Sequence, residues 1–398
     1  MKTDLAVEAA KWQENLIQIR RHLHSFPELG SEMDHTVEFV KKHLESLGVE
    51  TDYSPDTGLV GVIRGAGKGP CVLLRADMDG LPIQEENDIP YRSVREGRMH
   101  ACGHDAHMTW LLGATALLMA HRDEIQGIVK LAFQPCEEGK GRPGAEDMIR
   151  GGIMERPRVD VAVAVHADPS VLAGRYSISP GGVTTTPCLF EIVVKGRGGH
   201  AAEPWDCVDP ILVMNQIYQA VQSIQRSELS PQHKSVISIT SMRAGEASNV
   251  IPERGIMAGT IRTFSREDAR VLAERIKQIS LAVGSAHGAE VKYEYEIPIG
   301  SSVNDVEICS RVERAVRELY GDEAVEREEH LFMGGDDFSF FAERVPSCYF
   351  FAGVRNESLS CVNPLHSCRF DLDESCLSRT AAVLAQFTLN YMEQMGEQ

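Results

Sequence analysis

Between residues 183 and 296 the chain follows the order strand, helix, strand, strand, helix, strand. The four strands are expected at 189–195, 235–242, 255–264 and 289–296, and the two helices at 210–225 and 266–283. Alternating or β-branched apolar residues mark the strands, and apolar residues three or four apart mark the helices. This βαββαβ order predicts a ferredoxin-like α+β domain.

The flanking segments, residues 1–182 and 297–398, alternate helical periods with short apolar runs. Strands are expected at 59–63, 71–76, 128–133, 159–165 and 348–354, and helices near 7–25, 34–48, 106–121, 144–151, 304–319, 336–343 and 376–393. Such alternation predicts a three-layer α/β domain with a mostly parallel sheet. We therefore expect one discontinuous catalytic domain, 1–182 and 297–398, interrupted by an inserted domain at 183–296.

Charge and hydropathy exclude several classes of protein. The formal net charge is -18 and no basic stripe is interleaved with aromatic residues, which argues against a nucleic-acid partner. No run is long and apolar enough to span a membrane, and the N-terminus lacks a signal-peptide core. We expect a soluble, cytoplasmic protein whose ten cysteines are reduced.

The string MHACGHDAH, residues 99–107, directly precedes a helical period. A thiolate at Cys102 and an imidazole at His104, separated by Gly103, can both turn onto one metal ion. By itself the string is equally compatible with an ordinary polar loop. Its interpretation depends on polar groups elsewhere in the chain.

A pair of carboxylates, Glu137 and Glu138, follows the predicted strand 128–133. Adjacent side chains at a strand end point in different directions, so one carboxylate can bind a metal ion while the other accepts a proton from water. A solvated acidic turn is the alternative interpretation.

Further metal-binding residue types stand at other predicted strand exits. Asp77 and Asp79 follow the strand 71–76, His166 follows the strand 159–165, and His366 lies in a loop near the C-terminus. The carboxyl ends of parallel strands meet at one edge of a sheet. We expect these groups, the glutamate pair and the Cys102 string to converge there.

Strings along the whole chain resemble one family of metallopeptidases. They are RADMDGLP, MHACGHDAH, FQPCEEG, VHADP, GRGGHAAEP, SNVIPE, GTIRTF, MGGDDFSFF and LHSCRF. In this order they resemble the aminoacylase and carboxypeptidase G type family, and within it the branch of hippurate hydrolases and plant indole-acetyl-amino-acid hydrolases.

The resemblance implies an amidohydrolase that cleaves N-acyl amino acids to a carboxylic acid and a free amine, with two divalent metal ions per subunit. Zinc, manganese, cobalt and nickel all suit such ligands. The alternatives are a dipeptidase or N-acetyl-amino-acid deacetylase of the same family, a non-catalytic homologue, and a thiol or redox protein centred on Cys102.

The resemblance also assigns roles to individual residues. The implied metal ligands are Cys102, His104, Glu138, His166 and His366. Glu137 is the implied general base, and Asp79 is the implied acid that orients the site. Asp77 falls where many relatives carry a metal-binding histidine and is left outside the ligand set. His100 and His107 are interpreted as structural or supporting residues.

Three residues of the inserted domain match substrate-contacting positions of the family. His200, which follows the flexible segment 196–199, is implied to polarise the scissile carbonyl or hold its oxyanion. Asn249 and Arg262 are implied to contact the substrate, and the guanidinium fork suits a carboxylate. A surface charge on an exposed strand is the alternative for Arg262. The resemblance further implies a homodimer formed through the inserted domain, whose sheet has two edge strands.

The sequence departs from the family pattern at three places. Cys136 replaces a common alanine, the loop 138–144 is more basic than the usual glycine run, and Ser367 and Cys368 stand where asparagine and proline are frequent. None of these departures removes a ligand. They leave the acyl group and the amino acid of the substrate open.

Overall fold

The structure is a computed structural model that describes residues 4–54, 57–139, 142–228, 234–327 and 332–396. The chain divides into two compact units, each of which is described by itself. Unit 1 comprises Met1–Val183, Ser302–Leu331 and Asp337–Gln398, and unit 2 comprises Thr184–Ser301 and Phe332–Asp336.

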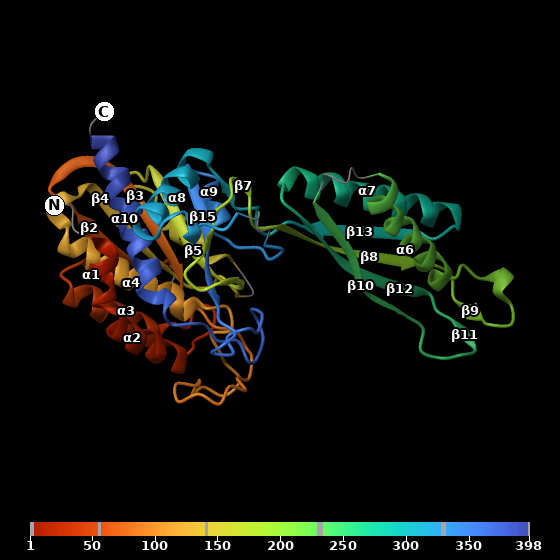
Figure 1. Cartoon of the computed structure of the whole chain (residues 1–398). Helices are drawn as coiled ribbons and strands as arrows, with labels where there is room; N and C mark the ends of the chain where they lie inside the picture. The colour runs from red at the N-terminus through yellow and green to blue at the C-terminus, as the bar shows by residue number, and fades with distance from the viewer. Residues whose placement is uncertain (1–3, 55–56, 140–141, 229–233, 328–331, 397–398) are drawn as a thin grey trace. The chain divides into compact units, whose positions relative to one another are not determined.

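Unit 1 is built on a seven-stranded sheet in the order β1-β2-β4-β3-β5-β15-β6 (Figure 1). The strands are β1 Glu50–Ser54, β2 Gly58–Arg64, β3 Gly67–Asp77, β4 Gln126–Gln134, β5 Val161–Leu172, β6 Tyr176–Ser177 and β15 Ser347–Arg355. The four central strands β4, β3, β5 and β15 are parallel, while β2, β1 and β6 join by antiparallel pairing. The predicted α/β fold with a mostly parallel sheet is confirmed.

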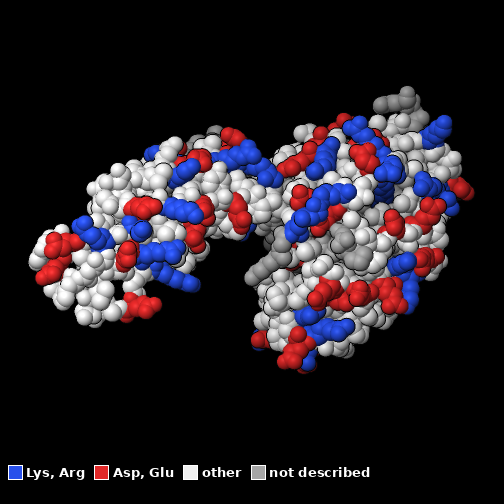
Figure 2. All heavy atoms as spheres, turned by 180° about the vertical axis from the view of Figure 1, so that it is seen from behind, with Lys and Arg blue, Asp and Glu red and all other residues white. Residues whose placement is uncertain are grey.

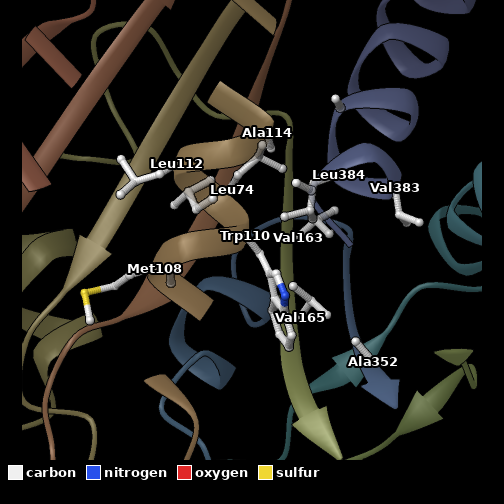
Figure 3. Close-up of a cluster of buried hydrophobic side chains, with 14 of the residues drawn as sticks. Leu74, Met108, Trp110, Leu112, Ala114, Val163, Val165, Ala352, Val383 and Leu384 are labelled. Atoms are coloured by element: carbon white, nitrogen blue, oxygen red, sulfur yellow. The ribbon is translucent and has the colours of Figure 1, made fainter. Parts of the chain in front are cut away.

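Helices surround this sheet. They are α1 Leu5–Ala10, α2 Gln13–Ser25, α3 Asp34–Ser46, α4 His104–Ala120, α5 Gly144–Arg150, α8 Val306–Tyr320, α9 Ser339–Ala342 and α10 Cys376–Gly396. Helix α4 is buried along nearly its whole length and contacts β3, β5, α2 and α10. Figure 3 shows Trp110 of α4 among Val163, Val165 and Leu384. Because close packing holds α4 on all sides, its first residue, His104, has a fixed position.

Two local expectations for unit 1 are wrong. The helix expected near 336–343 is reduced to the four residues of α9, and two glycines, Gly334 and Gly335, lie just before this segment. Strand β5 continues to Leu172 because it stays paired with β15, so His166 lies inside the strand and not just beyond its end.

Unit 2 contains a four-stranded antiparallel sheet in the order β10-β12-β8-β13, with α6 and α7 on one face (Figure 1). Its elements are β8 Thr186–Lys195, α6 Pro210–Ser227, β10 Ser235–Ala244, β12 Arg254–Thr263, α7 Arg266–Ala286 and β13 Glu290–Glu296. Apolar side chains of α6 and α7, such as Ile217 and Ile276, pack on the sheet. The predicted βαββαβ order is confirmed.

The chain passes between the units four times, after residues 183, 301, 331 and 336. Strand β7, Gly181–Gly182, pairs antiparallel with β14, Val303–Asn304, so the segments that leave and re-enter unit 1 lie side by side. The third passage brings Phe332–Asp336 into unit 2. There the Thr185 N–H donates to the Gly334 carbonyl at 2.8 Å, and its hydroxyl donates to the Met333 carbonyl at 2.9 Å.

The surface mixes both signs of charge. Basic and acidic side chains are interspersed over most of the face seen in Figure 2. Within the described part of the chain, every helix is too short or too polar to cross a membrane. All ten cysteines are free thiols.

Candidate metal centre

The five side chains predicted as metal ligands lie together in unit 1. They form overlapping groups whose ligand atoms lie within 4.8 Å of one another: Cys102, His104 and His166; Cys102, Glu138 and His366; and His104, Glu137 and Glu138. Cys102 lies just before α4 and His104 is its first residue, while His166 comes from β5 and the other two predicted ligands come from the loops after β4 and before α10. The structure therefore brings the whole predicted ligand set to one place, with Glu137 beside it.

Cys102 and His104 reach this place at the start of a helix, as expected from the helical period that follows their string. Gly103 has φ of +84°, a left-handed conformation that glycine adopts without steric cost. A Cβ atom on Gly103 would lie 2.9 Å from the Cβ of Ala167 on β5. Only glycine allows this turn to pack directly against the strand that carries His166.

His104 presents one ring nitrogen to the centre. Its Nδ1–H donates to the Asp79 carbonyl at 2.7 Å, which directs Nε2 inward. Nε2 is buried and has no hydrogen-bond partner among the described residues, with Asp77 Oδ2 3.8 Å and Glu137 Oε2 4.0 Å away. Burial lowers the pKa of His104, but the charges of Asp77 and Asp79 outweigh burial and raise it to about 10. The surroundings of this nitrogen therefore attract a cation.

Cys102 and His166 face each other, with Sγ 3.5 Å from Nε2. The His166 Nδ1–H donates to the Ala167 carbonyl at 2.8 Å, so its Nε2 is the nitrogen turned to the thiol. Burial, and then the charges of Glu138 and Glu137, raise the pKa of the Cys102 thiol well above its usual range. A thiol in such surroundings is a poor nucleophile unless a bound cation stabilises its thiolate.

Glu138 and His366 complete the set from two loops. The His366 Nε2 lies 2.9 Å from Glu138 Oε1. Burial raises the pKa of Glu138, but the hydrogen bond from His366 and the charge of His104 outweigh burial and lower it. His366 has φ of +63°, unusual for a residue with a side chain, and its N–H donates to the Ala101 carbonyl at 2.8 Å. This bond ties the C-terminal loop to the cysteine string.

Asp79 holds the backbone of both glutamates. Its two carboxylate oxygens accept the N–H groups of Glu137 at 3.1 Å and of Glu138 at 3.0 Å. The preceding residue, Cys136, has φ of +62°, which turns the chain sharply after β4. The Glu137 side chain is 10% exposed, so it is reachable while it lies next to the ligands.

The donor set suits divalent cations. One thiol, three imidazoles and one carboxylate are ligands that zinc and related transition metals accept. The partnerless Nε2 of His104 and the high pKa of Cys102 are both unfavourable in a buried site without positive charge, and a cation would relieve both.

Comparison with known proteins decides the family. The sequence model of peptidase family M20/M25/M40 matches residues 73–390 of this chain. This chain belongs to that family. It is therefore a metal-dependent hydrolase that acts on amide or peptide bonds, and the family resemblance expected from the sequence strings is confirmed.

Full-length relatives agree with this assignment. The chain is 37% identical to thermostable carboxypeptidase 1 of Saccharolobus solfataricus, covering 94% of this chain and 95% of that protein. It is 35% identical to the IAA-amino acid hydrolase ILR1-like 4 of Arabidopsis thaliana, covering 95% and 86%. It is 32% identical to the N-acetylcysteine deacetylase of Bacillus subtilis, covering 95% and 97%.

A solved structure shares both units. The YXEP protein of Bacillus subtilis, a dinuclear metal-binding peptidase of the M20 family, superposes with a TM-score of 0.85 at 29% identity, covering 96% of this chain and 99% of that one. The inserted domain and its α/β host are therefore both features of this M20 fold.

The remaining predicted site residues of this M20 family member lie in unit 2. His200 is exposed in the short strand β9, Gly199–His200, which pairs with β11, Val250–Ile251, and the Ala201 N–H donates to the Asn249 carbonyl at 3.1 Å. Arg262 is half-buried near the other end of β12, eight residues after Arg254, which corresponds to about 27 Å of extended strand. Unit 2 thus brings His200 and Asn249 together but keeps Arg262 apart from them.

A buried charge network behind α4 was not predicted. Arg20 of α2 is fully buried, and its Nε lies 2.7 Å from the Asp105 carboxylate, which also lies 2.8 Å from His24 Nδ1. His24 Nε2 lies 3.2 Å from Glu85. Because Asp105 directly follows His104, the network fixes the start of α4 to α2. The signal was the spacing of Arg20 and His24, four residues apart on the apolar face of a helix.

Proposed function

We propose that this M20 family member hydrolyses N-acyl amino acids to a carboxylic acid and a free amino acid. In this proposal Cys102, His104, Glu138, His166 and His366 hold two divalent cations, which could be zinc, manganese, cobalt or nickel. When bound, such cations lower the pKa of water and polarise a carbonyl group. The observation that carries the proposal is the position of the Glu137 carboxylate, which forms one compact group with His104 and Glu138.

Glu137 has the geometry of a general base. It accepts a proton from the attacking water and returns it to the departing amine, which requires a carboxylate that is accessible yet fixed. Its backbone N–H is held by Asp79 and its side chain is one-tenth exposed. In this proposal Asp79 acts on the reaction by positioning Glu137, which agrees with its implied role as the acid that orients the site.

His200 and Arg262 are the proposed substrate contacts with the clearest chemistry. Because they lie apart on unit 2, we propose that one subunit of a homodimer supplies Arg262 and its partner supplies His200 to the same substrate. The Ala202 N–H donates to His200 Nδ1 at 3.1 Å, so a neutral His200 carries its proton on Nε2, where it can donate to a carbonyl oxygen. Among the described residues, no carboxylate pairs with Arg262. Its guanidinium is therefore available to the free carboxylate of an N-acyl amino acid substrate. Asn249, exposed beside His200, is the third proposed contact.

The names of two relatives support this substrate class. One is a hydrolase of IAA-amino acids and one a deacetylase of N-acetylcysteine, and both names describe an acyl group on an amino acid. The 37% identity to a carboxypeptidase favours a second candidate, removal of a C-terminal residue from a peptide. The two candidates share one chemistry because the last peptide bond of a peptide is also the amide of an N-acylated amino acid.

We further propose a homodimer formed through unit 2, whose edge strands β10 and β13 are each paired on one side only. Analytical ultracentrifugation of the whole chain tests this. A monomer at all concentrations would contradict it.

The function is tested by amine release from purified protein with benzoyl-, acetyl- and indole-acetyl-amino acids and with dipeptides. Activity should disappear with a chelator and return with one of the four metals. Activity that survives chelation would instead support a thiol enzyme centred on Cys102. Benzoylglycinamide, which lacks the free carboxylate of benzoylglycine, should be hydrolysed far more slowly, and equal rates would contradict the proposed role of Arg262.

A further inference from the structure

His107 lies in α4 three residues after His104 and is fully buried. Its Nδ1 lies 2.6 Å from Asp77 Oδ1, and the Ala167 N–H donates to its Nε2 at 2.8 Å. A backbone N–H can only donate, so Nε2 is the acceptor and the ring proton on Nδ1 points to Asp77. Both ring nitrogens are therefore used inside the protein, although Asp77, His104 and His107 are close enough together to hold a metal ion.

Asp77 is itself held in place by a buried ion pair with Arg75. Arg75 Nη1 lies 2.6 Å from Asp77 Oδ2, and Arg75 Nη2 lies 3.0 Å from Asp337 Oδ1. The Gln134 amide donates to the same Asp337 carboxylate at 2.7 Å. All of these side chains are buried. The ion pair with Arg75 satisfies one oxygen of Asp77 and leaves the other aimed at His107.

The backbone of Ala167 links His107 to the metal centre. Strand β3 pairs with β5 only as far as Arg75↔Ala164, and three residues later the Ala167 N–H is bonded to His107 instead. The Ala167 carbonyl accepts the Nδ1–H of His166, whose Nε2 faces Cys102. The backbone of one residue, Ala167, is thus held by His107 at its N–H and holds the His166 ring at its carbonyl.

We propose that the Asp77–His107 pair is a positioning device that orients His166 through the backbone of Ala167. The inference rests on the proposed function in one respect, that His166 is a metal ligand. The His104 ring is oriented by the carbonyl of Asp79, which lies on a different segment of the chain. The His166 ring is oriented by the carbonyl of the next residue, Ala167, so the backbone of Ala167 must itself be held in place. Groups that orient metal ligands in this way change metal affinity by about 10- to 100-fold when they are removed.

Two substitutions separate the two hydrogen bonds of His107. His107→Gln places an amide oxygen near the position of Nε2, so it can still accept the Ala167 N–H while it loses the donor to Asp77. His107→Asn keeps a donor near Asp77 but is too short to reach Ala167. A purely space-filling role for His107 predicts no advantage of glutamine over asparagine.

The measurement is the titration of metal-free full-length protein with Co²⁺, followed by the absorption bands of thiolate-bound cobalt. We expect His107→Asn to bind Co²⁺ about 10- to 100-fold more weakly than the unsubstituted protein, and His107→Gln to bind within a few-fold of it. Equal affinities of the asparagine variant and the unsubstituted protein would overturn the proposal, as would equal losses in both variants. If the unsubstituted protein itself binds no Co²⁺, the proposed function fails as well.

Asp77→Asn provides a second test if His107→Asn does not fold. It removes the charge that holds the His107 ring without opening a cavity, and we expect a loss in Co²⁺ affinity of about tenfold. The loss should largely vanish when Asp77→Asn is made in the His107→Gln background, because the effect passes through His107. Additive losses in the double variant would contradict transmission through His107.

Discussion

The two units bury different kinds of side chain. Unit 1 encloses charged groups that pair across long stretches of sequence, such as Arg20 with Asp105 and Arg75 with Asp337. In unit 2, the described buried polar residues between 187 and 300 are Thr263 and Ser280, and the other buried polar residues of this unit stand next to the crossings of the chain, at 184–186, 301 and 336. The difference indicates that unit 1 is shaped around a charged centre, whereas unit 2 is a frame that presents side chains from its surface.

Glu137→Gln gives the largest expected effect and tests whether chemistry belongs to unit 1. The glutamine cannot accept a proton, so kcat should fall by about 100- to 10,000-fold while Co²⁺ affinity and the stability of both units stay unchanged. Steady-state kinetics and the cobalt titration measure this. Turnover near that of the unsubstituted enzyme would refute the assignment of Glu137 as base.

Arg20→Met tests whether buried charge holds unit 1 together. It leaves the Asp105 carboxylate without its buried cation, and we expect a loss of about 3–5 kcal/mol in the free energy of unfolding of unit 1. The matched control is Arg275→Met in unit 2, which removes an exposed ion pair with Glu228 and should leave stability unchanged. Hydrogen exchange measured by mass spectrometry separates the two units. Equal losses of unfolding free energy for the two substitutions would contradict the proposed difference between the two units.

His200→Ala tests the contribution of unit 2. Loss of one donor to a developing oxyanion should lower kcat by about 100- to 1,000-fold. Co²⁺ affinity should not change, because His200 lies in a different unit from the predicted ligands. An unchanged kcat would remove His200 from the mechanism, and a large change in metal affinity would mean that the units are not separate in function.

The smallest expected effect is a pH dependence confined to unit 1. Burial lowers the pKa of His24, but the charge of Asp105 and the hydrogen bonds to Asp105 and Glu85 outweigh burial and raise it to about 9. The folded chain therefore binds this proton more tightly than the unfolded chain, whose histidine titrates near 6.5. The stabilisation is complete below about pH 6.5 and is lost as pH rises through about 9, by at most about 3 kcal/mol.

Urea unfolding at several pH values measures this loss, with His24→Gln as the control. The substitution should reduce the decline above pH 6.5 in unit 1 by the contribution of His24 and leave unit 2 unaffected, while the decline that remains belongs to other histidines whose pKa is also raised, such as His104. A decline of equal size in the variant would assign the pH dependence to other groups.

Unit 2 could be predicted almost element by element, because its signals are local. The helix expected at 210–225 is α6, Pro210–Ser227, and the strand expected at 255–264 is β12, Arg254–Thr263. Alternation with a period of two or of 3.6 residues is set within each segment, so no knowledge of distant residues is needed.

For the site in unit 1, the sequence predicted which residues belong to it but not the contacts that hold them in place. Residue types and family strings pointed to the cluster around Cys102, yet the pairing of Arg20 with Asp105 joins residues 85 positions apart. No period in the sequence reports such a pair. The left-handed backbone of His366 was equally hidden, since it depends on the Ala101 carbonyl from a distant loop.

The third passage of the chain between the units limits how unit 2 could be exchanged between relatives. The paired strands β7 and β14 bring the two main junctions close together, so the stretch 184–301 resembles a cassette that recombination could replace in one step. The Thr185 bonds to Met333 and Gly334 show that it is not self-contained. A chimera that transplants 184–301 without residues 332–336 combines segments of two different parents inside unit 2, so its junctions should be designed around all four crossings.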